Sequence, residues 1–271
     1  MDRQTLSNLI RERRNFLCVG LDPDPAKMPA HLLDEPHPLF AFNKAIIDAT
    51  CDHCVGYKVN SAFYEAFGTH GWEQLEMTAA YLPDTHFRIA DAKRGDIGNT
   101  AARYAEAFLG RLPFDAITVA PYMGEDSVTP FLREGKWVIL LALTSNQGAH
   151  DFQYHGATEQ PLHQAVVRKA CQWAGPDQLM FVTGATRAED LAAIRSLAPD
   201  HFLLVPGVGA QGGSLEAVTR AAMTPAVGLL VNSSRQVIHA SSGPDFAEAA
   251  AQAATAWCQE MEVLLPSIGL H

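Results

Sequence analysis

The segment Asp91-Ala-Lys93-Arg-Gly-Asp96 brings two carboxylates and an ammonium group together within six residues. Alternation along a strand puts Asp91 and Lys93 on the same side, and opposite charges a few ångströms apart keep each other ionised. A fixed cation beside a fixed anion suits a reaction that builds carbanion character and then needs a proton. The same description fits enediolate chemistry, and a structural ion pair is the non-catalytic alternative. Lys58 favours catalysis, because a structural pair needs no further converging charge.

A second group of residues could hold a phosphate. Glycines in the run from Pro206 to Gly213 let backbone N–H groups approach an oxyanion, and Arg235 follows the next apolar run with a guanidinium that can bind phosphate in bidentate fashion. Alone, the glycines would fit an ordinary tight turn equally well. Their pairing with Arg235 favours a phosphate site, for which the candidates are Pro206, Gly207, Gly209, Ser234 and Arg235.

Neither a metal nor a cofactor is predicted. Cys51-Asp-His-Cys54 could be a metal or redox motif, but no second pair lies at zinc-ligand spacing. The five cysteines are odd in number and lie in apolar contexts, unlike the disulfide framework of a secreted protein. The histidines are dispersed. We therefore expect Cys51 and Cys54 to be buried or half-buried thiols on a helix.

These side chains need elements that bring them together, and the chain offers eight short apolar, β-branched runs. Segments with helical spacing lie between them, including 42–54, 100–109, 159–174, 188–197 and 214–222. Strands that alternate with helices pair in parallel, and near-continuous hydrophobicity indicates strands covered on both faces. The predicted strands are 16–22, 56–60, 87–93, 116–121, 137–144, 179–185, 201–207 and 228–235.

Eight such units predict an α/β fold, a (β/α)8 TIM barrel formed by a single domain over residues 1–271, with a doubly wound open sheet as the alternative. Barrel enzymes place their chemistry at the carboxyl ends of the strands. Polar residues lie at or just beyond most of these ends, and such clustering favours an active site there. They are Asp22, Lys58 with Asn60, Asp91 with Lys93, Thr144 with Ser145, Gly207 and Arg235.

Composition limits the possible partners and location. A formal net charge of −10 argues against a general binder of nucleic acid or of membrane surfaces, because these need extended basic surface. The first residues are polar, and no apolar stretch is long enough to span a bilayer. We expect a cytoplasmic protein that holds any anionic ligand at a local positive site.

The motifs together resemble the orotidine 5'-phosphate decarboxylase family, in its longer bacterial type. The run DAKRGDIGNTA is preceded by GLDPDP and GYKVNSAFYEAFG and followed by VAPYMGEDSV, LTSNQG, VPGVGAQGG and VNSSR. The likeness therefore covers nearly the whole chain in the expected order. It implies a barrel that converts orotidine 5'-phosphate to UMP and CO2 in de novo pyrimidine synthesis, without a cofactor.

The resemblance also implies roles for individual residues. Lys93 would donate a proton to C6 of the pyrimidine, Asp91 would lie beside the departing CO2, and Lys58 would position Asp91 and the ribose hydroxyls. Asp96 and Thr100 would reach across a homodimer interface into the neighbouring site. Among the substrate-binding candidates, Asp22 would contact the ribose, Ser145 would read the pyrimidine edge, and Gln211 would bridge phosphate and base. Asn60 is a candidate through its place with Lys58 at the second strand end.

Several questions stay open from the sequence. The short bacterial form usually has Gly-Arg at the end of the eighth strand, where this chain has Ser234-Arg235. The segment 147–154, with His150 and His155 near it, fits a mobile lid or a solvated loop equally well. A Mg2+-dependent phosphosugar decarboxylase or hexulose-phosphate synthase would use the same Asp91, Lys93 and Asp96. A non-catalytic barrel that senses a nucleotide is the alternative from another class.

Overall fold

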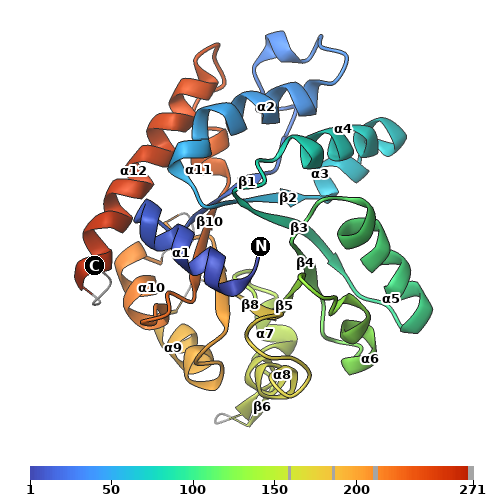
Figure 1. The fold of residues 1–271 in the computed structure, drawn as a ribbon, viewed down its shortest axis with the longest axis vertical. Helices are drawn as coiled ribbons and strands as arrows, with labels where there is room; N and C mark the ends of the chain where they lie inside the picture. The colour runs from blue at the N-terminus through green and yellow to red at the C-terminus, as the bar shows by residue number, and fades with distance from the viewer. Residues whose placement is uncertain (158–159, 185–186, 210–212, 268–271) are drawn as a thin grey trace.

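The computed structural model of this 271-residue chain describes residues 1–157, 160–184, 187–209 and 213–267. Eight parallel strands form a closed barrel, surrounded by helices (Figure 1). The closure confirms the predicted (β/α)8 barrel and excludes the open doubly wound sheet, which would leave two edge strands. The barrel strands are β1 (Leu17–Leu21), β2 (Gly56–Asn60), β3 (Phe87–Arg94), β4 (Ala116–Val119), β5 (Trp137–Leu143), β8 (Leu179–Thr183), β9 (Phe202–Pro206) and β10 (Leu229–Ser233).

The strands form where the apolar runs were found, and four of the eight, β1, β4, β8 and β10, are buried along their whole length. The five residues of β1 and of β10 are all buried, as expected for strands covered by side chains inside the barrel and by helices outside it. Several strands end one or two residues earlier than predicted. Among the residues left out of the strands, Asp22, Thr144 and Ser234 belong to the loops above the barrel, and Arg235 begins the short helix α11.

The helices cover the outside of the barrel (Figure 1). Two helices begin earlier than predicted: α2 at Pro38 rather than at residue 42, and α5 at Gly98 rather than at residue 100. Proline is tolerated at the start of α2 because the N–H groups of a first helical turn have no partner within the helix. α5 then continues as a π-helical turn, Glu106–Arg111, and the predicted helix 159–174 is limited to α8. The helices are α1 (Arg3–Arg13), α2 (Pro38–Thr50), α3 (Ala62–Glu65), α4 (Gly68–Tyr81), α5 (Gly98–Ala105), α6 (Glu125–Val128), α7 (Ala149–Phe152), α8 (Leu162–Ala170), α9 (Ala188–Leu197), α10 (Leu215–Ala222), α11 (Arg235–Ile238) and α12 (Phe246–Ser267).

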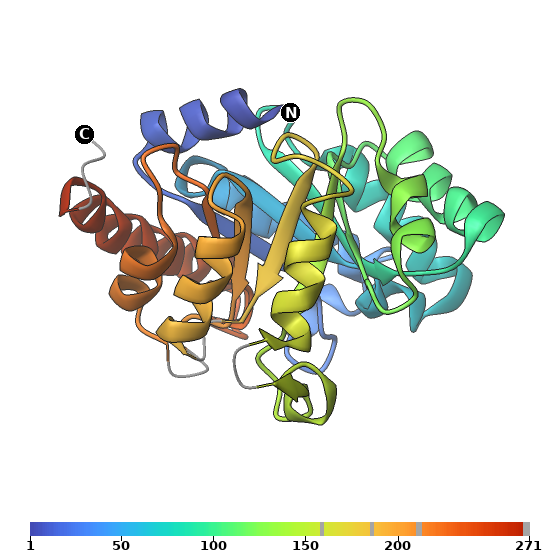
Figure 2. The same cartoon turned by 90° about the horizontal axis from the view of Figure 1, so that it is seen from below.

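The N-terminal helix closes one end of the barrel. Figure 2 shows α1 lying across the end at which the strands begin. The Met1 ammonium group lies 2.8 Å from Asp115 Oδ1, and Trp137 Nε1 donates a hydrogen bond to the carbonyl oxygen of Met1. Asp115 and Trp137 lie at the starts of β4 and β5. The opposite end, where the strands finish, is therefore the accessible one.

The segment between β5 and α8 has structure of its own. α7 is followed by a small antiparallel hairpin of β6 (Gly156–Ala157) and β7 (Gln160–Pro161). Gln153 holds this segment on the barrel, because its side chain bonds both the backbone N–H and the hydroxyl of Thr144. No helix among the described residues is both long and apolar enough to cross a bilayer.

Candidate active site

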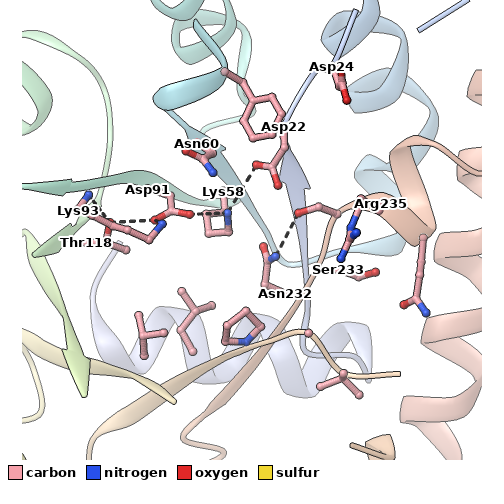
Figure 3. A pocket seen from close by; sticks show the side chains of 18 of the residues that line it. Asp22, Asp24, Lys58, Asn60, Asp91, Lys93, Thr118, Asn232, Ser233 and Arg235 are labelled. Atoms are coloured by element: carbon pink, nitrogen blue, oxygen red, sulfur yellow. Dashed lines mark hydrogen bonds and ion pairs between the residues drawn. The ribbon is translucent and has the colours of Figure 1, made fainter. Parts of the chain in front are cut away.

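A cluster of alternating charges lies at the carboxyl ends of β2 and β3 (Figure 3). Lys58 Nζ lies 2.8 Å from Asp91 Oδ2, and Lys93 Nζ lies 2.6 Å from Asp91 Oδ1. Parallel pairing sets Asn60 opposite Asp91, so that Lys58, two residues earlier on β2, shares a face with Asp91. The fold thus brings together the two lysines and the aspartate that the sequence singled out.

The second carboxylate of the cluster is Asp22, which follows β1. Lys58 Nζ lies 3.7 Å from Asp22 Oδ1, so the buried ammonium group on β2 is shared between carboxylates after β1 and on β3, the strands on either side of it. Asp96 was expected in the array, but within the described residues it does not line the pocket of its own chain. Its carboxylate instead accepts the backbone N–H of Ile97.

The cluster keeps its members charged. Burial by itself would lower the pKa of the Lys58 ammonium group, but Asp22 and Asp91 outweigh it and raise that pKa well above its ordinary value. Burial would likewise raise the pKa of the Asp91 carboxyl, yet Lys58 and Lys93 hold it well below the usual range. Lys58 is therefore a cation and Asp91 an anion at neutral pH.

Thr118 is a site residue that the sequence analysis missed. It lies on β4 with 1% of its surface exposed, and its hydroxyl donates to Asp91 Oδ1 over 3.0 Å and accepts the backbone N–H of Lys93 over 2.9 Å. A signal for it was present, because Thr118 is the only hydroxyl-bearing residue in the predicted strand 116–121.

The charged cluster forms one wall of a cavity of about 300 Å³. This is at the lower end of the size range of small-molecule sites. Apolar side chains from the middle of the barrel form its floor, and the loops after β9 and β10 form its far side. Its lining includes the expected Asp22, Lys58, Asn60, Asp91, Lys93, Pro206, Gly207, Ser234 and Arg235, together with Phe63, Thr118, Leu141, Val182, Leu204, Asn232 and Ser233.

The far side of the cavity offers an exposed guanidinium and turning backbone. Arg235 is exposed, and among the described residues it forms no ion pair. Gly207 has a φ of 81°, a conformation that favours glycine. Ser234 has a φ of −109°, which any residue adopts, so the chain does not require the family's usual glycine there. The Gly209 N–H already donates to the carbonyl oxygen of Gly213 and is not free for a ligand.

Three other expected residues lie elsewhere. Thr100 is exposed on α5, and Ser145 is half-buried just beyond β5, packed tightly against Gly184; neither lines the cavity of this chain. A Cβ atom at Gly184 would come within 2.9 Å of the Ser145 backbone nitrogen, so Gly184 sets the position of Ser145. Gln211 lies outside the described residues.

Metal-ligand groupings lie away from this cavity. Within the described ranges, the one cluster whose ligand atoms lie close enough together to hold a metal ion consists of His37, His70 and Glu73. Both histidines lie at helix starts, where the helix dipole disfavours a cation, and His70 and Glu73 are exposed. Cys51 begins a short 3-10 turn and Cys54 follows it, and both are free thiols. Burial raises the pKa of Cys54 to about 12.

Comparison with known proteins places this geometry in a family. Residues 15–255 match the model of the "Orotidine 5'-phosphate decarboxylase / HUMPS family". The chain belongs to this family. It is 54% identical to an orotidine 5'-phosphate decarboxylase of Bacteroides fragilis, over 99% of this chain and all of that protein. It is also 54% identical to one from Flavobacterium johnsoniae, over 98% of this chain and 99% of the relative.

Solved structures agree with the family assignment. The OMP decarboxylase of Leishmania donovani superimposes with a TM-score of 0.83 at 35% identity, covering 97% of this chain and 98% of that one. The family match over residues 15–255 includes the segments that carry Lys58, Asp91 and Arg235. The resemblance inferred from the motifs is therefore confirmed at the level of the family.

Proposed function

We propose that this chain, as a single-domain barrel, decarboxylates orotidine 5'-phosphate to UMP and CO2 in pyrimidine biosynthesis, with Lys93 as the proton donor and no cofactor. The observation that carries the proposal is the engagement of Asp91 by two ammonium groups, Lys58 at 2.8 Å and Lys93 at 2.6 Å, at the wall of a cavity whose other side carries Arg235. This arrangement supplies a proton at one end of a nucleotide-sized site and a phosphate ligand at the other.

The reaction needs only one bond to break and one to form at the pyrimidine ring. The bond between C6 and the carboxylate breaks, CO2 leaves, and its bonding electron pair stays on C6. The Lys93 ammonium group stabilises the developing negative charge and transfers its proton to C6, which gives UMP and a neutral Lys93 amine. Asp91 holds this ammonium group in place, and Lys58 holds Asp91 in turn.

Magnitudes indicate which effect is largest. Enzymes lower barriers by about 8 to 23 kcal/mol, and a decarboxylation with no adjacent electron sink lies towards the difficult end of that range. A carboxylate about 4 Å from the substrate carboxylate would repel it by about 4 kcal/mol at an effective dielectric constant of 20. Repulsion by Asp91 is therefore too small alone, and preorganised stabilisation of the carbanion by Lys93 carries more.

The remaining lining residues suit the rest of the nucleotide. Asp22 and Asn60, beside Lys58, are within the part of the cavity where ribose hydroxyls would lie. The backbone at Gly207 and Ser234 and the Arg235 guanidinium are assigned to the phosphate, with Pro206 shaping the turn. Ser145 is assigned to the pyrimidine edge, Gln211 to a bridge between phosphate and base, and Gly209 to the shape of the phosphate loop rather than to a direct bond.

We propose that the enzyme is a homodimer in which Asp96 and Thr100 complete the partner's site. Both residues follow β3 at the accessible end of the barrel, outside the cavity of their own chain. Large apolar side chains are exposed on this segment and on the next loop, with 57% of Ile97, 87% of Tyr122 and 46% of Met123 accessible. Such exposure suits a protein interface.

The rival Mg2+-dependent sugar-phosphate chemistry fits the charged cluster less well. Asp91 Oδ2 accepts a hydrogen bond from Lys58, and Oδ1 accepts from both Lys93 and Thr118. A metal ion would have to displace an ammonium group to reach this carboxylate. A non-catalytic nucleotide sensor would have no need for two lysines held on one aspartate.

The test is an ultraviolet assay with metal-free protein. Orotidine 5'-phosphate incubated with the enzyme in EDTA should show the absorbance change of conversion to UMP, at a rate unchanged by added Mg2+. A strict requirement for Mg2+ would support the sugar-phosphate alternative. Tight UMP binding without any turnover would support the nucleotide sensor.

A further inference from the structure

Thr118 lies opposite an irregularity in the barrel that contains the charged residues. On β3 and β4, Ala90 pairs with Ile117 and Arg94 pairs with Val119. Three residues of β3, Asp91 to Lys93, therefore face a single residue of β4, and that residue is Thr118. The register shift is a bulge, a feature that re-aims side chains and interrupts the backbone hydrogen bonds of a sheet.

The bulge puts Lys93 in an unusual backbone conformation. Its φ is 47°, in the left-handed region that non-glycine residues rarely adopt and that persists only where the surroundings enforce it. The Lys93 N–H bonds the Thr118 hydroxyl over 2.9 Å, where a regular sheet would offer a backbone carbonyl oxygen. A buried threonine side chain thus replaces the missing rung of the sheet.

The same hydroxyl also fixes the carboxylate. A hydroxyl has one proton to donate and can accept hydrogen bonds at the same time. Thr118 donates its proton to Asp91 Oδ1 over 3.0 Å, the oxygen to which Lys93 Nζ also donates. The side chain therefore links the backbone of Lys93 to the anion that holds the ammonium group of Lys93.

We propose that Thr118 is a positioning residue, which holds the Asp91–Lys93 bulge in the shape that presents the Lys93 ammonium group to the substrate. The inference rests on the proposed function of Lys93 as proton donor. Thr118 acts through Asp91 and Lys93, and its contribution is to the geometry of proton transfer rather than to substrate affinity.

The experiment compares Thr118→Val, which keeps the shape and loses both hydrogen bonds, with Thr118→Ser, which keeps the hydroxyl. For Thr118→Val we expect kcat to fall about ten- to hundredfold, with KM and the Kd for UMP within about threefold of wild type. Thr118→Ser should stay within a few-fold of wild type. The matched control is Thr219→Val, because Thr219 is buried on α10 and its hydroxyl has no hydrogen-bond partner among the residues that the structure describes; its kcat should be unchanged.

Amide hydrogen exchange provides a readout independent of turnover. The peptide that contains Asp91 to Arg94 should exchange faster in Thr118→Val than in wild type or Thr118→Ser, since the Lys93 N–H loses its acceptor. If Thr118→Val does not fold, Thr118→Ala takes its place in both measurements. An unchanged kcat in the folded variant, or an equal loss in Thr118→Ser, would overturn the proposal. Absence of decarboxylase activity in the wild-type protein would refute the proposed function. Amide hydrogen exchange would still test whether Thr118 holds the bulge.

Discussion

Gly20 on β1 lies directly against Ser234, the residue that precedes α11 beyond the last barrel strand. A Cβ atom at Gly20 would come within 1.8 Å of Ser234 Oγ and 2.9 Å of Ser234 Cβ. Contacts under 3 Å force one partner to move, and Ser234 is followed immediately by Arg235. The first strand of the barrel thus sets the position of the proposed phosphate-binding segment at the end of the last.

Gly20→Ala should therefore weaken phosphate binding. We expect KM for orotidine 5'-phosphate to rise about tenfold or more, with a loss of about 1–3 kcal/mol in the free energy of unfolding from overpacking. Steady-state kinetics and urea denaturation would measure the two effects. Gly175→Ala is the control, because a Cβ atom there meets no atom of the described part of the chain within 4 Å. Wild-type KM in Gly20→Ala would show that Ser234 and Arg235 tolerate displacement.

Lys93→Ala should abolish turnover while the fold remains. Removing the proton donor should lower kcat by about 10⁴-fold or more, while Asp91 keeps its hydrogen bonds from Lys58 and Thr118. Calorimetric binding of UMP, which depends on the phosphate contacts, should persist. Turnover near the wild-type rate would remove Lys93 from its assigned role.

Asp91→Asn should destabilise the protein in a pH-dependent manner. The substitution leaves the buried Lys58 ammonium group with Asp22, 3.7 Å away, as its counter-ion and Lys93 facing a neutral amide, at a cost of about 3 kcal/mol or less near neutral pH. The folded-state pKa of Asp91 is depressed below its ordinary value of 3.8. Its stabilising contribution is therefore complete above that value and is lost as the pH falls further, because the unfolded chain then takes up a proton first.

Urea denaturation from pH 7 down to pH 3 would measure this effect. The difference in unfolding free energy between wild type and Asp91→Asn should narrow as the pH falls below 4. Asp177→Asn, at a side chain that is 80% exposed, should give no such trend. A difference that stays constant with pH would contradict the assigned ionisation of Asp91.

Mixed dimers test the proposed sharing of sites. In a hybrid of Lys93→Ala and Asp96→Ala subunits, one of the two sites would combine an intact Lys93 with an intact Asp96. Random exchange between equal amounts makes half of the dimers hybrids, so about a quarter of the wild-type activity should return. The activity would be assayed after subunit exchange has been verified by mass spectrometry. Sites contained within single chains would give no recovery.

Arg195 should contribute to stability without affecting catalysis. It is 9% exposed at the closed end of the barrel, and its guanidinium donates to the carbonyl oxygens of Ala198, Pro199, His201, Ala222 and Gly228. Arg195→Ala leaves these acceptors unsatisfied and should lower the free energy of unfolding by about 3 kcal/mol or more. Arg220→Ala, at an exposed ion pair, should cost about 0.5 kcal/mol or less. Urea denaturation would separate the two, and kcat should be unchanged in both.

The sequence predicted the barrel and the meeting of Lys58, Asp91 and Lys93 because both follow from short-range patterns. Apolar runs separated by helical spacing define parallel strands, and the carboxyl ends of such strands meet at one end of a barrel. Asp22 was recognised at the first strand end, but the sharing of Lys58 between Asp22 and Asp91 depends on the register in which β2 pairs with β1 and β3, which the sequence pattern does not define.

Other features depend on contacts between distant segments. The bulge at Asp91–Lys93 does not change the pattern of apolar residues in the sequence, so that pattern gave no reason to separate Thr118 from other strand residues. The early start of α2 depends on Gln74, whose side chain accepts the backbone N–H groups of Leu39 and Phe40 from 34 to 35 residues away. The contact between Gly20 and Ser234 arises only when the first and last strands pair.

The two lysines of the cluster differ in their access to water. Only 7% of the Lys58 side chain is exposed, whereas half of the Lys93 side chain is. A donor that gives up its proton in every catalytic cycle must be reloaded before the next substrate arrives. In the role proposed for Lys93, bulk water would reprotonate its amine directly through the open mouth once UMP has left, and no internal relay of acids and bases would be needed to reset the site.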